Sequence, residues 1–259
     1  MAFAQRFKAA MGAAIKHLLG SLAVGTVCAA LVFGLWYPYP YGELVGGREL
    51  FLLLISVDVI CGPLLTFVVF DPRKLRRELW RDIGIIVFLQ GVALAYGIAT
   101  VIQARPVYLA FEGDRFRVVS VPDVEFSEIN RAPESLRNLS LTGPRMLGVH
   151  LVKSGDPDYL QSIKAALGGL HPAFRPSRWV EYEQQHQTVR DNARSLAQLK
   201  GKNPNEQRLI NETILKTNLN EQQLGYLPLA AGNHTDWVVI IGLEDAQPKA
   251  YLPLDGWLN

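Results

Sequence analysis

The chain has 259 residues, of which 49% are hydrophobic and 19% are charged, and its formal net charge is +2. This length is sufficient for one membrane domain followed by one soluble domain. The small positive charge does not indicate a nucleic-acid-binding protein, because the basic residues gather beside apolar segments and not on one continuous patch.

Three apolar segments predict membrane-spanning helices at residues 17–36, 50–70 and 83–104. About 20 consecutive apolar residues are long enough for a helix to cross a bilayer. A short basic and amphipathic lead, residues 1–16, precedes the first span. A signal peptide is the alternative for this N-terminus, but the apolar segment is longer than a usual signal sequence and no clear cleavage site follows it.

The loop between the second and third predicted spans is basic, with positive side chains at Arg73, Lys74, Arg76, Arg77 and Arg81. The loop between the first and second spans contains only Arg48 as a basic residue. The positive-inside rule therefore places the N-terminus and the basic loop on the cytoplasmic side of the membrane. Residues 105–259 are then expected on the opposite side, which in a Gram-negative bacterium is the periplasm. The basic side chains are expected to determine topology, and they could also contact anionic lipids or a cytoplasmic partner.

Two shorter signals lie beside these spans. Asp71-Pro72 is typical of a helix start and predicts a short interfacial helix in the basic loop. Pro63, which follows Gly62, lacks a backbone N–H group and is expected to kink the second span. Such a kink could open a groove for a partner helix, or it could only alter the shape of the bundle.

Asp58 is an ionisable residue inside the second span, where such groups are costly and usually face protein or water. At about 1.5 Å per residue it lies roughly 12 Å below the outer edge of that span. Tyr96 of the third span and Thr26 of the first span are expected at a similar depth. Three roles stay open for Asp58: a hydrogen bond to Tyr96 or Thr26 that stabilises the bundle, recognition of a partner helix, or proton chemistry.

Thr66 and Gln90 are matched in depth nearer the cytoplasmic edge, where an interhelical hydrogen bond is worth only about 1 kcal/mol. They can stabilise the bundle or bind a partner helix. The predicted bundle or partner contacts are therefore Asp58, Gly62, Pro63, Thr66, Gln90 and Tyr96.

From Arg105 onward the composition is that of a soluble domain. The β-prone segments 106–111 and 115–121 flank the turn Glu112-Gly113-Asp114 and predict a hairpin. Further strands are expected at 145–152, 225–230, 236–243 and 248–254, and helices at 156–167, 179–200 and 205–219. Strands at both ends with helices between them predict an α+β domain with a mostly antiparallel sheet.

No catalytic or metal-binding pattern is visible in the sequence. The histidines lack metal-ligand spacing, and there is no Walker loop, no G-x-G-x-x-G and no G-x-S-x-G. We therefore expect no enzyme activity, no metal and no cofactor.

Three stretches resemble the type IV pilin accessory proteins, the TfpX/TfpZ-like group: VDVICGPLLTFVVFDPRK at 57–74, RDIGIIVFLQGVALAYGIATVIQARPVYLAFEGDRFRVV at 81–119, and DWVVIIGLEDAQPKAYLPLDGW at 236–257. The resemblance is weaker from about Val121 to Asn220. It implies a three-span inner-membrane protein with a periplasmic domain, linked to assembly of a cognate pilin.

That resemblance implies a chaperone-like accessory factor for pilus assembly or dynamics. Its partners would be the major type IV pilin, through the pilin transmembrane helix and periplasmic head, and membrane lipids. Pilin helices generally carry one glutamate near the cytoplasmic end, at a depth suited to Gln90 and Thr66. Residues 122–219 would recognise the head. A membrane sensor with a periplasmic ligand-binding domain is the alternative, and a membrane enzyme that uses Asp58 or periplasmic acidic residues is a third possibility.

Overall fold

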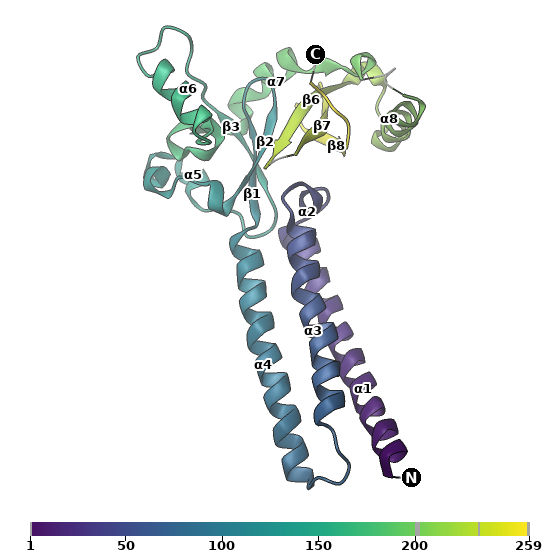
Figure 1. The fold of residues 1–259 in the computed structure, drawn as a ribbon. Helices are drawn as coiled ribbons and strands as arrows, with labels where there is room; N and C mark the ends of the chain where they lie inside the picture. Colours follow the sequence, from purple (N-terminus) through teal and green to yellow (C-terminus); the bar gives the residue numbers. More distant parts are fainter. Residues whose placement is uncertain (1, 200–202, 233, 258–259) are drawn as a thin grey trace. The chain divides into compact units, whose positions relative to one another are not determined.

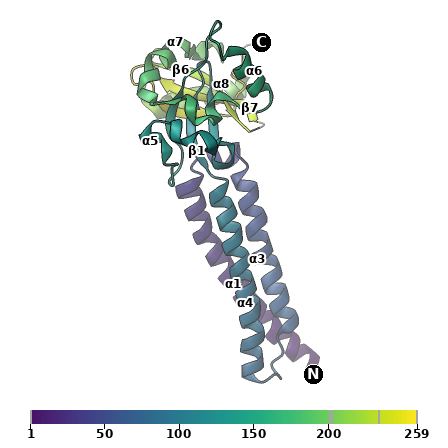
Figure 2. The same ribbon diagram turned by 90° about the vertical axis from the view of Figure 1, so that its left-hand side faces the viewer.

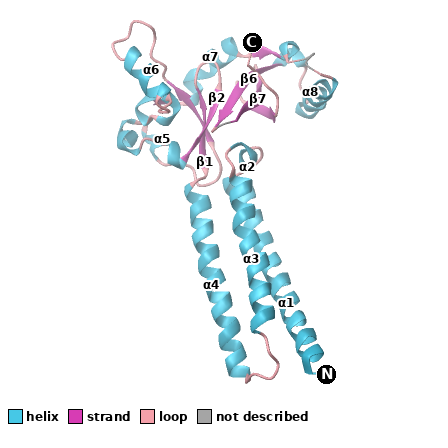
Figure 3. Cartoon of the chain, in the orientation of Figure 1, coloured by secondary structure: helices cyan, strands magenta, loops and turns pink. Residues whose placement is uncertain are grey.

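The computed structural model describes residues 2–199, 203–232 and 234–257. The chain forms two compact units, Met1–Arg105 and Pro106–Asn259. The first unit is helical and the second contains a sheet with helices around it (Figure 3). Each unit is described by itself below.

The first unit consists of long apolar helices. Its elements are α1 (Ala2–Leu31), which continues through a π-helical turn at Val32–Trp36, α2 (Tyr41–Leu44), α3 (Gly47–Val69) and α4 (Arg76–Gln103). Among the described residues, three helices are long and apolar enough to cross a membrane: Phe3–Trp36, Gly47–Val69 and Arg76–Gln103. The prediction of three long apolar helices followed by an α+β domain is confirmed.

Helix α3 lies between α1 and α4 (Figure 1). Small residues let the helices approach closely. At three glycines an added methyl group would overlap a side chain of the neighbouring helix: Gly25 beside Ile55, Gly62 beside Gln90, and Gly97 beside Leu54. These glycines fix the faces along which α1 and α4 pack against α3.

Contacts at both ends hold the bundle together. At the end with the α3–α4 loop, Arg6 of α1 lies 3.7 Å from Asp71, and the rings of Phe7 and Phe67 meet edge to face. At the other end, the buried Tyr37 hydroxyl donates a hydrogen bond of 2.8 Å to the Val101 carbonyl. Helix α1 therefore reaches the α3–α4 loop with its N-terminal part, as Figure 2 also shows.

One prediction about a helix start is wrong. The basic lead is helical and continues without a break into the first apolar segment. Asp71-Pro72 does not begin an interfacial helix, because the Asp71 carboxylate accepts a hydrogen bond from the Arg73 backbone N–H and stabilises a turn. Helix α4 begins only at Arg76.

The second unit contains one sheet with the strand order β4-β3-β1-β2-β6-β7-β8, and β5 pairs with β6. The strands are β1 (Pro106–Phe111), β2 (Phe116–Ser120), β3 (Arg145–Val149), β4 (Trp179–Val180), β5 (Arg194–Ser195), β6 (Leu224–Ala231), β7 (His234–Gly242) and β8 (Pro248–Leu252). The predicted hairpin at Glu112-Gly113-Asp114 joins β1 to β2.

The sheet is mixed, so the prediction of a mostly antiparallel sheet is wrong. Strand β3 is parallel to β1, and β6 is parallel to β2. Residues 112–144 separate β1 from β3, and residues 121–223 separate β2 from β6. Connections of this length allow a crossover to a parallel neighbour. The local strand pattern does not report strand direction.

The helices of the second unit are α5 (Glu134–Arg137), α6 (Tyr159–Leu167), α7 (His186–Asn192) and α8 (Pro204–Thr217), with short 3-10 turns between them.

The predicted helix 179–200 is wrong. Trp179 pairs with β3 and donates its indole N–H to the Ala173 carbonyl, and Arg194 pairs with β6. These tertiary contacts leave α7 as the only α-helix among residues 179–199, with 3-10 turns at Tyr182–Gln185 and Leu196–Gln198. Lys200, the predicted end, lies outside the described residues.

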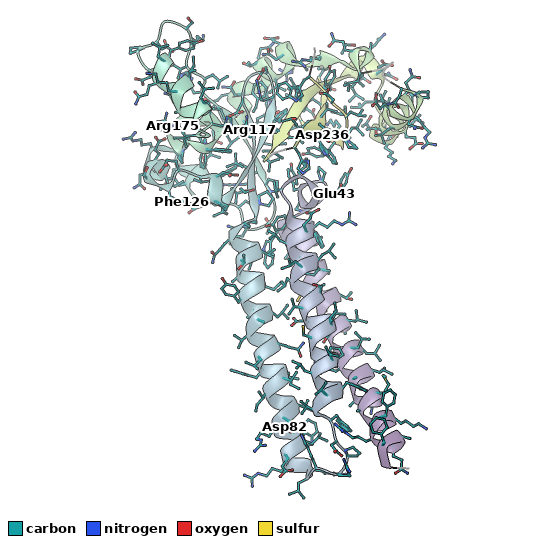
Figure 4. All side chains as sticks on the ribbon, in the orientation of Figure 1. Glu43, Asp82, Arg117, Phe126, Arg175 and Asp236 are labelled. Carbon is teal, nitrogen blue, oxygen red and sulfur yellow. The ribbon has the colours of Figure 1, made fainter. Side chains whose placement is uncertain are left out.

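A buried ion pair lies within this sheet unit. Arg117 of β2 is labelled in Figure 4, and its Nε lies 2.7 Å from a carboxylate oxygen of Glu112. The other oxygen of Glu112 accepts the backbone N–H of Ala173 at 3.1 Å. A buried charge pair of this kind needs such additional hydrogen bonds to offset its desolvation.

Candidate functional site

A groove of about 730 Å³ lies within the helical unit. Helices α1 and α4 each pack along α3 but make few contacts with each other. Side chains from all three helices line the groove; they include Ala9, Gly12, Ala13, Gly20 and Ser21 of α1, Ile55, Asp58 and Thr66 of α3, and Ile83, Val87, Gln90, Gly91 and Leu94 of α4. Most of these side chains are small or apolar, so the groove suits an apolar occupant.

The middle of the groove contains two polar residues. Asp58 lies halfway along α3 and only 7% of its surface is exposed. Gln90, halfway along α4, donates its Nε2 group to the Asp58 backbone carbonyl at 3.1 Å. The Oε1 atom of Gln90 is buried and has no hydrogen-bond partner among the described residues. The Gln90 amide therefore packs against Gly62 of α3, and its oxygen has almost no accessible surface.

Basic groups line the end of the groove nearer the α3–α4 loop. Lys8 and Lys16 are exposed on α1 and line the groove with His17. The Nδ1 atom of His17 lies 2.6 Å from the hydroxyl of Thr66, which is 2% exposed. An anionic group on a bound partner would be favoured at this end.

The predicted pairing of Asp58 with Tyr96 or Thr26 is wrong. Tyr96 is 77% exposed, and the Thr26 hydroxyl bonds to the Leu22 carbonyl of its own helix. Depth alone does not give the rotation of a helix about its axis. Gln90 and Gly97 face α3, and because successive residues are about 100° apart, Tyr96 points elsewhere.

The remaining predicted contact residues lie on or near the same face of α3. Gly62 is buried beneath the Gln90 amide, so it permits the close packing of α4 on α3. Helix α3 continues through Pro63 to Val69. Thr66 and Gln90 both line the groove, but Thr66 pairs with His17 and Gln90 with Asp58. No hydrogen bond joins Thr66 to Gln90.

The basic residues of the α3–α4 loop and the start of α4 make mostly local ion pairs. Arg73 lies 2.8 Å from Asp71, and its hydrogen bonds hold the pKa of the Asp71 carboxyl well below its usual range. Lys74 lies 2.8 Å from Asp82, which Figure 4 labels, and Arg81 lies 3.4 Å from the same carboxylate. Two further arginines, Arg76 and Arg77, are exposed.

Sequence reasoning missed the groove residues of α1. Lys8, Lys16, His17 and Ser21 lie at helical spacing along α1, on the side that meets the groove. The polarity of His17 and Ser21 within the first apolar segment was a signal, because polar side chains in a membrane helix usually face protein or water. The described residues hold no group of three or more histidine, cysteine, aspartate or glutamate side chains that could bind a metal.

Comparison with known proteins identifies relatives. The family model of the fimbrial assembly protein FimB matches residues 5–46. The chain is 35% identical to the fimbrial assembly protein of serogroup I of Dichelobacter nodosus, with 92% of each chain aligned, and 34% identical to the serogroup E1 protein over the same share. A serogroup C1 and C2 protein is 41% identical over 49% of this chain and 98% of its own length. No solved structure is significantly similar to the chain. The resemblance to type IV pilin accessory proteins is thus confirmed, and the chain belongs to the family of fimbrial assembly proteins.

Proposed function

We propose that the protein is an inner-membrane accessory factor that holds a cognate type IV pilin before the pilin enters the filament. In this role, α1, α3 and α4 span the membrane and the second unit lies in the periplasm. The N-terminus and the basic α3–α4 loop face the cytoplasm, in accord with the positive-inside rule. The role is non-enzymatic and chaperone-like.

The observation that carries this proposal is the groove in a helical bundle of a fimbrial assembly protein family member. A monomeric pilin is a single apolar helix with a globular head. A protein that holds it needs a membrane surface for the helix and a periplasmic surface for the head. The chain has a groove in its membrane unit and a separate α+β unit, so it offers one surface for each part.

The bonds within the groove change which residues would meet the pilin glutamate. The Thr66 hydroxyl is paired with His17, and the Gln90 N–H is paired with Asp58. Both groups therefore already have a partner inside the bundle. Lys8 and Lys16, exposed at the same end of the groove, are the cationic groups that can bind this glutamate.

The proposal is tested in the host bacterium. Deletion of the gene should reduce surface piliation, and a plasmid copy should restore it. The tagged full-length protein, solubilised in a mild detergent, should co-purify with the pilin subunit. Normal piliation after deletion, together with no pilin in the purified sample, would contradict the proposal. An unrelated three-span membrane protein with the same tag serves as the control for capture.

A further inference from the structure

We propose that the groove between α1 and α4 holds one anionic phospholipid, with its phosphate at Lys8 and Lys16 and an acyl chain along the groove. The lipid comes from the leaflet on the side of the α3–α4 loop. This inference goes beyond the proposed function, because it concerns the protein before a pilin arrives. The phosphate occupies the lysines that are assigned above to the pilin glutamate, so pilin binding would displace the lipid.

The cations at the loop end of the groove are not neutralised by the chain itself. Two neighbouring arginines, Arg6 and Arg73, both lie within ion-pair distance of Asp71. Lys8 and Lys16 line the groove with exposed side chains, and neither forms an ion pair with a carboxylate of the described residues. Basic pockets between transmembrane helices bind anionic lipid headgroups. A phosphate would supply the anion that this end of the groove lacks.

The two lysines can reach one headgroup although they stand two turns apart on α1. Side chains on a helix tilt toward its N-terminus, and the N-terminal part of α1 lies at the α3–α4 loop. The Lys16 side chain therefore leans toward Lys8. A long lysine side chain can bury its methylene groups against the groove while its ammonium group extends toward the headgroups.

Aromatic residues mark the headgroup depth at the same end. Trp80, in the second turn of α4, lines the groove and is 74% exposed. Tryptophan is enriched at the boundary between membrane and water. Phe70, directly after α3, lines the groove at this level too. The contact between the rings of Phe7 and Phe67 places the adjacent Lys8 at that level on α1.

The length and the interior of the groove match one leaflet. Along α4 the groove extends from Trp80 to Leu94, which is about 21 Å at 1.5 Å per residue. One leaflet with its headgroups is about 20 to 22 Å thick. Asp58 is only 7% exposed and the Gln90 Oε1 atom has almost no accessible surface, so few polar atoms reach the groove at mid-depth. The surface that remains there is suited to an acyl chain.

The test uses the tagged full-length protein produced without pilin, so its result does not depend on the proposed function. Native mass spectrometry in a mild detergent should show one retained phosphatidylglycerol per chain, in preference to the zwitterionic phosphatidylethanolamine. Lys8→Gln with Lys16→Gln should lower the affinity for phosphatidylglycerol about twenty- to thirtyfold, which is about fivefold for each charge. Arg76→Gln with Arg77→Gln is the matched control, because these arginines are exposed but do not line the groove. It should leave the affinity unchanged.

A second set of variants tests the acyl chain. A methyl group built on Gly12, Gly84 or Gly91 meets no atom within 4 Å, so leucine at each position should leave the protein folded. Gly12→Leu and Gly91→Leu fill the groove and should lower phosphatidylglycerol retention about fivefold or more. Gly84→Leu, at an exposed position outside the groove, should not change it. If a filled variant does not fold, phosphatidylglycerol with a photoactivatable acyl chain should label the wild type at Val87, which lines the groove, and not at the exposed Phe88.

The inference is overturned by equal loss of affinity in the two charge pairs, or by equal retention of the two phospholipids, since either result indicates general attraction to the basic end of the bundle. Unchanged retention in both filled variants, or equal labelling of Val87 and Phe88, would show that the acyl chain lies elsewhere. A wild type that retains no phospholipid but captures co-expressed pilin through Lys8 and Lys16 would assign the groove to the pilin helix alone. Each of these results leaves the proposed function standing, because pilin co-purification tests that function separately.

Discussion

The Nδ1 atom of His17 lies 2.6 Å from the hydroxyl of Thr66, and this contact joins α1 to α3. Thr66 is 2% exposed, so water has little access to its hydroxyl. Together with the bond from Gln90 to the Asp58 carbonyl, it links all three long helices through polar contacts. Both contacts border the groove, so they stabilise the bundle and shape the candidate site.

We expect Thr66→Val to destabilise the helical unit by about 1 kcal/mol, because interhelical hydrogen bonds in membranes are typically worth about 0.6 to 1.7 kcal/mol. Valine keeps the shape of threonine and removes only the hydroxyl. Reversible unfolding in mixed micelles measures the change. A double-mutant cycle with His17→Leu should return a coupling energy of similar size. Additive effects of the two substitutions would show that the pair is not coupled.

The packing glycines should be far less tolerant than the groove glycines. We predict that Gly62→Leu and Gly97→Leu reduce folded protein in the membrane, because their side chains would overlap Gln90 and Leu54. Gly12→Leu and Gly91→Leu should leave the folded amount unchanged. Overpacking of a filled interface typically costs about 1 to 3 kcal/mol. The comparison is made by detergent-resistant folding and membrane abundance, and equal tolerance at all four positions would contradict the packing described here.

The buried pair of Glu112 and Arg117 should be costly to break from one side. Glu112→Ala leaves the Arg117 charge without its partner and the Ala173 N–H without its acceptor, and removal of one member of a buried pair typically costs about 3 to 5 kcal/mol. Replacing both charges, Glu112→Leu with Arg117→Met, should cost less than Glu112→Ala alone. Urea unfolding of the full chain in detergent, followed by tryptophan fluorescence, tests this order; the reverse order would show that the charges are hydrated.

The sheet unit should lose stability in acid through Glu128. Burial tends to raise the pKa of this carboxyl, but hydrogen bonds from Arg175 and Ser177 outweigh it and hold the pKa below the ordinary value of 4.5. The folded state therefore binds fewer protons than the unfolded state in this range. The resulting stabilisation is fully present above pH 4.5 and is lost as the pH falls through the lower folded pKa.

Glu128→Gln should abolish this part of the acid sensitivity, because the amide does not titrate. The slope of unfolding free energy against pH below pH 4.5 should decrease, by at most about 1.4 kcal/mol per pH unit for one proton. Glu134→Gln, at an exposed carboxylate, is the matched control and should keep the wild-type slope. If Glu128→Gln also keeps it, the contacts of Glu128 with Arg175 and Ser177 do not set the acid response.

Local patterns were sufficient for several elements but not for their arrangement. The apolar segments predicted the three long helices, and the turn at Glu112-Gly113-Asp114 predicted the first hairpin, because both depend on nearby residues. Helix rotation was not predictable, since α4 faces α3 with Gln90 and not with Tyr96. The glycines that set this rotation act only through the neighbouring helix.

The middle of the sheet unit shows the same limit. The sequence pattern of residues 179–200 predicted one long helix, but strand pairing at Trp179 and Arg194 leaves α7 as the only α-helix among residues 179–199. The parallel pairings of β1 with β3 and of β2 with β6 also depend on long connections. In the candidate site, Asp58, Thr66 and Gln90 were identified from their polarity within apolar segments, whereas their actual partners depend on tertiary packing.

The most direct test of the account is the membrane topology of the full chain. Alkaline phosphatase fused to the C-terminus should be active, because it folds only outside the cytoplasm, and green fluorescent protein at the same position should be dark when exported by the Sec pathway. The reverse should hold for fusions within the basic loop after Lys74. A fluorescent and phosphatase-inactive C-terminal fusion would place the α+β unit in the cytoplasm, and a factor that receives the pilin head in the periplasm would then be excluded.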